Sequence, residues 1–226
     1  MKSFVIFQNQ IDMSVKFAQE AVEEAGKFGI FLRGWVGSDG LKDQHKFEQY
    51  GIKNFLQDKI EKLPGVKGCF LSHYELWKKC LDEGETFLIL EHDGIFIREL
   101  PKDIEDHFDH VLNLDPYDQF SEDYNEKIEK SLSMPIKIQE AKTYDHDKAG
   151  MYLRGAYGYL IKPQGAERLI NFAHDKGALP TDKHIGTAVV DIKTTSVPVV
   201  RLHKFFNMKN LRKFSLTKNL EKFSDV

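Results

Sequence analysis

Two carboxylates, Glu91 and Asp93, follow directly after the apolar run at residues 87–90. Residues two apart on an extended strand point to the same face, so we expect both carboxylates on one side and His92 on the other. Two carboxylates at a strand end offer the hard oxygen ligands that Mg²⁺ or Mn²⁺ prefers, beside substrate phosphates. Acid-rich triplets of this kind also occur in solvated turns, and the pattern alone leaves both interpretations open.

Ser72 and His73 form a second candidate site, near the start of a helix expected to follow Gly68. Free backbone N–H groups and the helix dipole favour an anion at such a position, so these side chains could contact a phosphate or a ribose. The alternative is that His73 is a buried histidine that packs beside Trp77. The residue types do not decide between the two.

The elements that must position these residues follow from hydrophobic spacing. Phe70, Tyr74 and Trp77 recur at helical intervals, which predicts an amphipathic helix over residues 69–81. Short β-branched and aromatic runs predict strands at residues 3–7, 30–36, 86–90, 111–114, 156–161 and 197–202. Two further helices are expected at residues 12–25, with Asp12 as the cap, and at residues 163–176, with Pro163 in first position.

Strands that alternate with helices predict an α/β sandwich with a mostly parallel sheet, in which ligands bind at the carboxyl ends of strands. The segment from Glu91 to Asp93 occupies such an end. No repeat or low-complexity linker divides the chain, so residues 1–226 are expected to form a single domain. Its C-terminal segment, about residues 201–226, is basic, and is either a solvated tail or a strap over an anionic ligand.

Composition excludes several classes of protein. Apolar residues make up 41% of the chain and the net charge is −3, which favours a globular protein and argues against a nucleic-acid partner. The apolar runs are far shorter than the roughly 18 residues of a membrane span, and nothing marks the N-terminus for export. We therefore expect a cytoplasmic protein, with peripheral membrane contact left open. Cys69 and Cys80 would lie about 16 Å apart on the predicted helix, too far for a disulfide.

Three blocks of sequence carry a resemblance to a known family. They are Gly68-Cys-Phe-Leu-Ser-His-Tyr-Glu-Leu-Trp77, then Phe87-Leu-Ile-Leu-Glu-His-Asp-Gly94, then Gly155-Ala-Tyr-Gly-Tyr-Leu-Ile161 with Gly165-Ala-Glu-Arg-Leu169. In this order they resemble glycosyltransferase family 25, which includes lipopolysaccharide and lipooligosaccharide sugar transferases. That family has a G-x-x-G-C-x-x-S-H helix, an E-D-D strand end and a G-x-x-x-Y-x-I strand before a Gly-Ala helix.

The chain departs from this family pattern at two places. His92 stands where the family has the middle acid of E-D-D, which bears directly on the use of a metal. The segment Gln8-Asn-Gln-Ile-Asp12 stands where the family usually has an Arg-containing stretch after the first strand. His92 is expected either to face the core or to act as a substitute ligand for Mn²⁺.

The resemblance implies a GT-A fold, a nucleotide-sugar donor that is usually a UDP-hexose, a divalent metal such as Mn²⁺ or Mg²⁺, and inversion at the anomeric carbon. It makes Asp93 a metal ligand that stabilises the charge of the departing diphosphate, with Glu91 beside it as a further ligand or donor contact. Ser72 and His73 become donor contacts. After the last strand, His203 is expected as a late metal or phosphate contact, and Lys204 as a cation for phosphate.

Asp182, in Pro180-Thr-Asp182, is the candidate base of the reaction that the resemblance implies. Inverting transfer needs a base that removes the proton of the acceptor hydroxyl, and family members tend to have Pro-x-Asp at this place. A carboxylate ahead of an apolar-periodic segment is equally typical of a helix cap. Catalysis and capping both stay open for this residue.

The leading hypothesis is thus a metal-dependent transfer of a hexose to a saccharide or glycolipid acceptor. One alternative is a protein that binds a nucleotide sugar without turnover, which the departures at His92 and residues 8–12 favour. A less favoured alternative is a metal-dependent phosphohydrolase that combines the acids at 91 and 93 with Asp145, His146 and Asp147. Binding of UDP without sugar transfer would distinguish the first alternative from the leading hypothesis.

Overall fold

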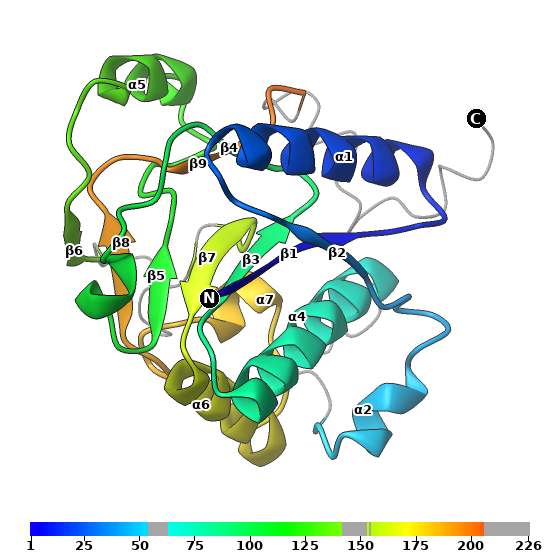
Figure 1. Ribbon diagram of the computed structural model, residues 1–226. Helices are drawn as coiled ribbons and strands as arrows, with labels where there is room; N and C mark the ends of the chain where they lie inside the picture. The colour runs from blue at the N-terminus through cyan, green and yellow to red at the C-terminus, as the bar shows by residue number, and fades with distance from the viewer. Residues whose placement is uncertain (54–62, 142–152, 154, 206–226) are drawn as a thin grey trace.

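The computed structural model describes residues 1–53, 63–141, 153 and 155–205. Within these residues, helices cover both faces of a central sheet, so that the described chain forms three layers (Figure 1). The alternation of strands and helices along the chain therefore confirms the predicted α/β class. The expectation of a single domain over residues 1–226 stays a prediction.

The central sheet has seven strands in the order β2-β1-β3-β7-β5-β8-β6. Their bounds are β1 Lys2–Phe7, β2 Arg33–Val36, β3 Phe87–Glu91, β5 Val111–Asn113, β6 Ile138–Glu140, β7 Gly158–Ile161 and β8 Ile192–Thr195. β1 pairs in parallel with β2 and β3, and β5 with β8, whereas β7 and β6 are antiparallel to their neighbours. Five of the seven strands run in one direction, as expected for a GT-A-like sandwich with a mostly parallel sheet.

Strand register brings the carboxyl ends of the first three strands to one edge of the sheet. Ile6 of β1 lies opposite Glu91 of β3, and Phe7 lies opposite Val36 of β2. The segments that follow these three strands therefore emerge side by side. This edge holds the candidate site described below.

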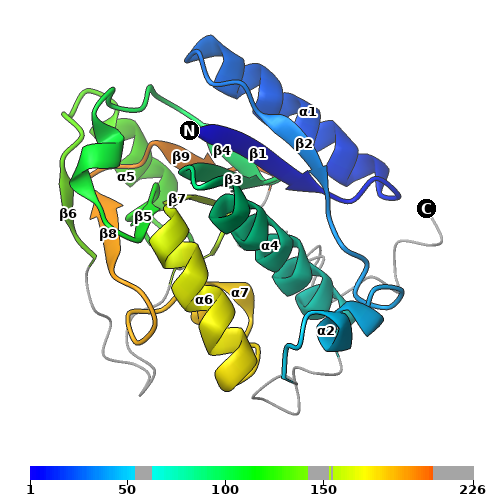
Figure 2. The ribbon, with the colours of Figure 1, turned by 60° about the horizontal axis from the view of Figure 1, so that its bottom comes forward.

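Alternating residues of β3 pack into two different hydrophobic cores. Phe87 and Ile89 face the layer made by α4 (Pro64–Glu83) and α6 (Pro163–Asp175). Leu88 and Leu90 face α1 (Asp12–Lys27) on the opposite side of the sheet. Figure 2 shows α4 and α6 together below the sheet and α1 above it. Burial on both faces explains why β3 is a continuous apolar run without polar alternation.

The helix expected at residues 69–81 is confirmed, but it is longer than its apolar spacing indicates. It begins at Pro64, whose missing N–H costs nothing in the first turn, and ends at Glu83 before Gly84, which has φ 66°. Its first turn thus precedes Gly68, which the sequence pattern treats as a breaker. The consequence is that Ser72 and His73 lie inside the helix and not at its start.

Several other boundaries differ from the expectations. Asp12 does not cap α1, because Ile11 is the cap residue and Asp12 lies in the first turn without a capping hydrogen bond. The strand expected at 30–36 begins at Arg33, and the one expected at 197–202 is β9, Val200–Leu202. β9 pairs antiparallel with β4, Gly94–Phe96, in a separate two-stranded sheet. That pairing fixes the chain immediately after Glu91.

The remaining described elements are short. They are α2 His45–Gln49, a 3₁₀ helix at Ile104–His107, α5 Tyr124–Ser131 and α7 Thr181–His184. No helix in the described ranges combines the length and the apolar character that crossing a bilayer requires. Cys69 and Cys80 both lie on α4 as free thiols, which confirms that they do not pair. The basic segment from residue 206 onward lies outside the described residues.

Candidate active site

A cavity of about 350 Å³ opens at the carboxyl ends of β1, β2 and β3. The N-terminal half of α4 forms one wall, and the chain just after β1 and β2 forms the others. The lining residues are Ile6, Phe7, Gln8, Gln10, Ile11, Ser38, Asp39, Gly40, Leu41, Gly65, Gly68, Cys69, Ser72, His73, Glu91 and His92. The cavity therefore gathers three of the residues selected from the sequence, Ser72, His73 and Glu91, together with His92.

The wall between α4 and the loop after β2 depends on glycine. A Cβ atom on Gly68 would lie 2.5 Å from the carbonyl oxygen of Ser38, and one on Gly40 would overlap the carbonyl oxygen of Pro64. Ser72 closes the contact, since its Oγ accepts a 2.8 Å hydrogen bond from the Ser38 N–H and donates to the Gly68 carbonyl across 2.6 Å. Ser72 thus lies at the cavity, and its two hydrogen bonds hold the loop after β2 against α4.

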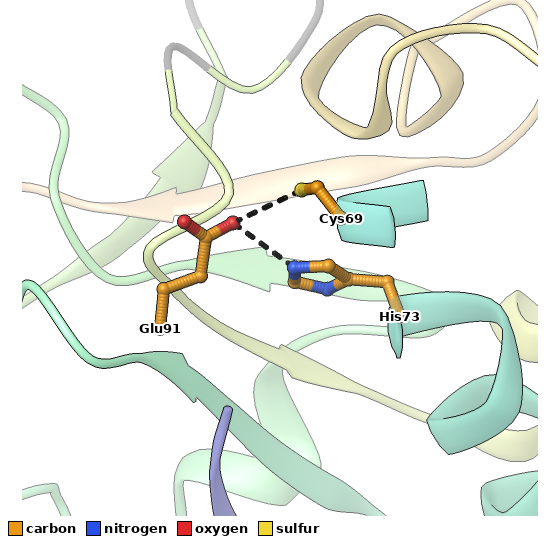
Figure 3. A group of neighbouring side chains, drawn as sticks. All are labelled: Cys69, His73 and Glu91. Atoms are coloured by element: carbon orange, nitrogen blue, oxygen red, sulfur yellow. Dashed lines mark hydrogen bonds and ion pairs between the residues drawn. The ribbon is translucent and has the colours of Figure 1, made fainter. Parts of the chain in front are cut away.

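Glu91 meets two side chains of α4, Cys69 and His73 (Figure 3), and all three residues line the cavity. Its Oε1 lies 3.0 Å from Nε2 of His73 and 3.7 Å from Sγ of Cys69. The three ligand atoms all lie within 4.8 Å of one another. Cys69 also lies 3.2 Å from the hydroxyl of Thr181, at the start of α7. Two side chains of α4 therefore contact one carboxylate oxygen of β3, and α7 contacts the thiol beside it.

A buried chain of hydrogen bonds sets the proton position on His73. Trp77 donates from Nε1 to the Tyr159 hydroxyl across 2.9 Å, and that hydroxyl lies 2.8 Å from Nδ1 of His73. Because the indole N–H can only donate, the hydroxyl accepts from it and keeps its own hydrogen available for Nδ1. Nε2 then carries the hydrogen that points at Glu91. His73 is thus a buried histidine whose Nε2–H is directed at Glu91.

The two acids of the site, Glu91 and Asp93, differ in the direction in which their pKa values are shifted. Burial acts to raise the pKa of Glu91, but the hydrogen bonds from His73 and Cys69 and the electrostatic attraction of His73 and His92 together outweigh it, so this pKa lies below its usual value. Burial raises the pKa of Asp93 to about 8, and the charge of Glu91 adds to that rise. Burial also raises the pKa of the Cys69 thiol. Glu91 is thus the stable anion of the cluster, and Asp93 is the carboxyl that resists ionisation.

The expectation that Glu91 and Asp93 share one face of a continuing strand is wrong. β3 ends at Glu91, His92 and Asp93 form a turn, and β4 begins at Gly94. The period-two rule fails here because the chain must turn to pair β4 with β9. Oδ1 of Asp93 is buried and has no hydrogen-bond partner among the described residues.

His92 turns toward α1. Its ring stacks with Phe17 at a centroid distance of 6.5 Å and an interplanar angle of 16°, and burial lowers its pKa to about 4. Burial thus keeps the imidazole neutral at neutral pH. Whether His92 coordinates a metal stays a prediction, although the side chain also lines the cavity.

Asp182 is brought to the cluster by α7. Burial raises its pKa, and the negative charge of Glu91 contributes to the rise. The capping interpretation is wrong, because Pro180 is the cap residue of α7 and Oδ1 of Asp182 accepts only from the adjacent Lys183 N–H among the described residues, at 3.0 Å. The base assignment remains a prediction, now with Asp182 in the electrostatic reach of Glu91.

His203 and Lys204 lie beside the turn that contains Asp93. The His203 N–H donates to the Asp93 carbonyl across 2.7 Å, while its Nε2 lies 2.9 Å from Oε2 of Glu20 on α1. Its Nδ1 accepts from the Phe205 N–H. As a metal ligand His203 would have to give up one of these bonds, so that role stays a prediction. Lys204 is exposed and beside it.

Two residues of the site, Cys69 and Tyr159, are not predicted as functional from the sequence. Cys69 belongs to the first block of the family resemblance but is given no role there, although its spacing of four from His73 on a helix is a signal that joins the two side chains. Tyr159 gives no such signal, because its contact with His73 joins segments 86 residues apart. The residues of the alternative phosphohydrolase site, Asp145, His146 and Asp147, lie outside the described residues.

Comparison with known proteins agrees with this geometry. The family model described as glycosyltransferase family 25 (LPS biosynthesis protein) matches residues 36–185. Human procollagen galactosyltransferase 2 is 26% identical over 173 residues, covering 68% of this chain and 25% of that protein. The chain thus spans about a quarter of the length of this curated relative. The matched range includes the cavity residues from Ser38 to His92 and also Asp182, but not the lining residues of β1.

Proposed function

The chain belongs to glycosyltransferase family 25, and we propose that it transfers a hexose from a UDP-linked sugar to a saccharide or glycolipid acceptor with inversion. The observation that carries the proposal is the cavity at the carboxyl ends of three parallel strands, which is where open α/β sheets bind their ligands. The hexose is supported by the name of the human relative, a galactosyltransferase. The acceptor class is supported by the family description.

The cavity suits a nucleotide in size and character. Its volume of about 350 Å³ falls in the range of roughly 300–1,000 Å³ that small-molecule sites occupy. Ile11 and Leu41 offer apolar surface to a base, and Gln8 and Ser38 offer polar groups to a base edge or ribose. Gly65, in the first turn of α4, also lines it, so the positive end of that helix dipole lies where phosphate would bind.

A divalent cation fits Asp93 better than it fits Glu91. Oδ1 of Asp93 is a buried oxygen that has no hydrogen-bond partner in the described part of the chain, which is the kind of ligand that Mg²⁺ or Mn²⁺ takes. Oε1 of Glu91 already receives the hydrogen bonds of His73 and Cys69. When bound, the cation would supply positive charge for the departing diphosphate. Asp93 would hold it, while Glu91 orients the neighbouring side chains, and His203 and Lys204 would approach from the chain after β9.

Asp182 is the proposed base for the acceptor hydroxyl. A buried carboxylate whose pKa is raised binds a proton more readily at neutral pH, which favours general-base catalysis. Its position beside Thr181, which contacts Cys69, sets it next to the Glu91 cluster. The acceptor hydroxyl would then attack the donor sugar between the cavity and α7.

Calorimetry of nucleotide binding followed by a transfer assay tests this function. UDP should bind more tightly with Mn²⁺ than with excess EDTA, and more tightly than GDP or CMP under the same conditions. Equal UDP affinity in Mn²⁺ and EDTA would contradict the metal bridge. UDP binding without transfer from any UDP-hexose to oligosaccharide acceptors would instead favour a binding protein without turnover.

A further inference from the structure

We infer that Cys69, His73 and Glu91 form a binding site for Zn²⁺, with its fourth coordination position open to the cavity. Zn²⁺ takes thiolate, imidazole and carboxylate ligands in tetrahedral geometry, and sites with three protein ligands keep one position for water or substrate. This ligand set differs from the hard oxygen that Asp93 offers to Mg²⁺ or Mn²⁺. The inference does not rest on sugar transfer.

The distances between the ligand atoms are close to those of a zinc tetrahedron. With Zn–S near 2.3 Å and Zn–O and Zn–N near 2.0 Å, tetrahedral geometry separates sulfur from oxygen by about 3.5 Å and nitrogen from oxygen by about 3.3 Å. The structure has 3.7 Å between Cys69 Sγ and Glu91 Oε1, and 3.0 Å between His73 Nε2 and the same oxygen. Shifts of a few tenths of an ångström would bring these two distances to the tetrahedral values, and the sulfur and the nitrogen lie within 4.8 Å of each other.

Rigid elements hold the three ligands. Cys69 and His73 are four apart on α4, so they lie one turn apart on the same face of the helix. His73 is buried and Cys69 is half-buried, and Glu91 is the last residue of strand β3. A ligand set of this kind loses little conformational entropy when it binds an ion.

The neighbours of the ligands match those of zinc ligands elsewhere. A metal-bound histidine usually has its other ring nitrogen in a hydrogen bond, and Nδ1 of His73 contacts the Tyr159 hydroxyl. When Zn²⁺ holds Nε2, the imidazole remains neutral with its hydrogen on Nδ1, which then donates to Tyr159. The Thr181 hydroxyl, 3.2 Å from the sulfur, can donate to the thiolate.

Binding of Zn²⁺ at this site releases one proton. Glu91 is already an anion, His73 changes only its tautomer, and the Cys69 thiol releases its proton to solvent as the Zn–S bond forms. All three residues line the cavity, so the ion has a route in and its fourth ligand would come from the cavity side. A diphosphate or water oxygen in the cavity could supply it.

Cobalt is the probe for this site, because Co²⁺ accepts the same ligands and reports thiolate coordination by its charge-transfer absorption. We expect Co²⁺ added to the chelator-treated protein to produce that band, and Zn²⁺ to abolish it. Cys69→Ser should remove the band and weaken Co²⁺ binding by at least tenfold, by analogy with the roughly 10–100-fold losses from weaker changes around metal sites. Absence of the band in the wild-type protein would overturn the inference.

Two variants serve as controls. Cys80→Ala removes the other thiol of α4, whose sulfur donates to the Glu85 carbonyl, and should leave the band intact. Asp93→Asn removes the carboxylate that we propose for Mg²⁺ or Mn²⁺, and it should also leave the Co²⁺ band intact. Persistence of the band in Cys69→Ser, or its loss in Cys80→Ala, would each contradict the assignment of the ligands.

A measurement on the wild-type protein covers the case in which Cys69→Ser fails to fold. Zn²⁺ should slow alkylation of Cys69 by iodoacetamide at least tenfold, followed by mass spectrometry of the peptide that contains it. Mg²⁺ at the same concentration should give no protection. Equal alkylation with and without Zn²⁺ would overturn the inference, and neither result depends on whether the protein binds UDP.

Discussion

Nε2 of His73 lies 3.0 Å from Oε1 of Glu91, and the hydrogen bond joins the middle of α4 to the last residue of β3. Its direction is set by Tyr159 and Trp77, which occupy the other side of the His73 ring. The acid that the sequence suggests as a metal ligand is therefore already engaged by protein donors. Oδ1 of the nearby Asp93, in contrast, has no hydrogen-bond partner within the ranges that the structure describes.

Tyr159→Phe should lower the free energy of unfolding by about 1–3 kcal/mol, because it leaves the Trp77 N–H and the His73 Nδ1 buried without a partner. Urea unfolding measures the loss. Tyr74→Phe, which removes one hydrogen bond to the partly exposed His174, is the matched control and should cost less. Nitrogen NMR of the wild-type His73 ring should show hydrogen on Nε2. A ring with hydrogen on Nδ1, or equal losses in the two variants, would refute the proposed network.

Asp93→Asn should reduce sugar transfer by about 10²–10³-fold, because an amide lacks the charge that holds a divalent cation beside the diphosphate. Its stability should change little, since burial already favours the neutral form of this side chain. Transfer rates at saturating Mn²⁺ and thermal unfolding of the same samples make the comparison. A variant that melts well below wild type yet retains transfer would make Asp93 a structural residue.

Asp182→Asn should slow transfer by about 10²–10⁴-fold, as expected when a general base is lost, while UDP affinity stays close to wild type. Asp175→Asn, at the exposed end of α6, removes a carboxylate away from the cluster and should transfer normally. Rates at saturating donor, with UDP affinity from calorimetry, separate the two effects. Normal transfer by Asp182→Asn would exclude it as the base.

Gly68→Ala should weaken UDP binding and destabilise the protein, because the new methyl group would lie 2.5 Å from the Ser38 carbonyl and push the cavity wall away from α4. Gly26→Ala on α1 is the control. Nothing lies within 4 Å of its added Cβ, so it should stabilise the helix by about 0.5–1 kcal/mol. Calorimetry of UDP and thermal unfolding of both variants check this. Unchanged UDP affinity in Gly68→Ala would show that the wall does not contact the nucleotide.

Asp115 should make stability depend on pH. It is buried, and accepts hydrogen bonds from the hydroxyls of Tyr124 and Tyr157 with Arg201 nearby. Burial raises its pKa to about 6 from an ordinary value of 3.8. The folded state thus binds the proton more tightly, so its stabilising effect is present below about pH 4 and is lost as pH rises through about 6.

The test is Asp115→Asn, whose amide does not titrate. The wild type should lose up to about 3 kcal/mol relative to this variant between about pH 4 and pH 7. Urea unfolding at both pH values measures the difference. A wild-type to variant difference that is the same at both pH values would mean that Asp115 does not change its protonation in this range.

The sequence by itself determines the class of fold and the elements that carry the site. Apolar runs such as residues 87–90 and the helical spacing of Phe70, Tyr74 and Trp77 specify β3 and α4, because burial acts on each element through its own periodicity. The blocks around His73, Glu91 and Tyr159 are also sufficient to indicate the family. Short elements with few apolar residues, such as β6, β8 and α5, are not predicted, because their pairing partners supply their stability.

Tertiary structure alone decides how these residues meet. A strand rule places Glu91 and Asp93 together, but the pairing of β4 with β9 turns the chain between them and separates their environments. Only the packing of α4 on the sheet directs Cys69 and His73 to the Glu91 carboxylate and brings Tyr159 of β7 to the other side of the His73 ring. Periodicity describes one element at a time, whereas hydrogen bonds between elements depend on how the elements pack together in the folded chain.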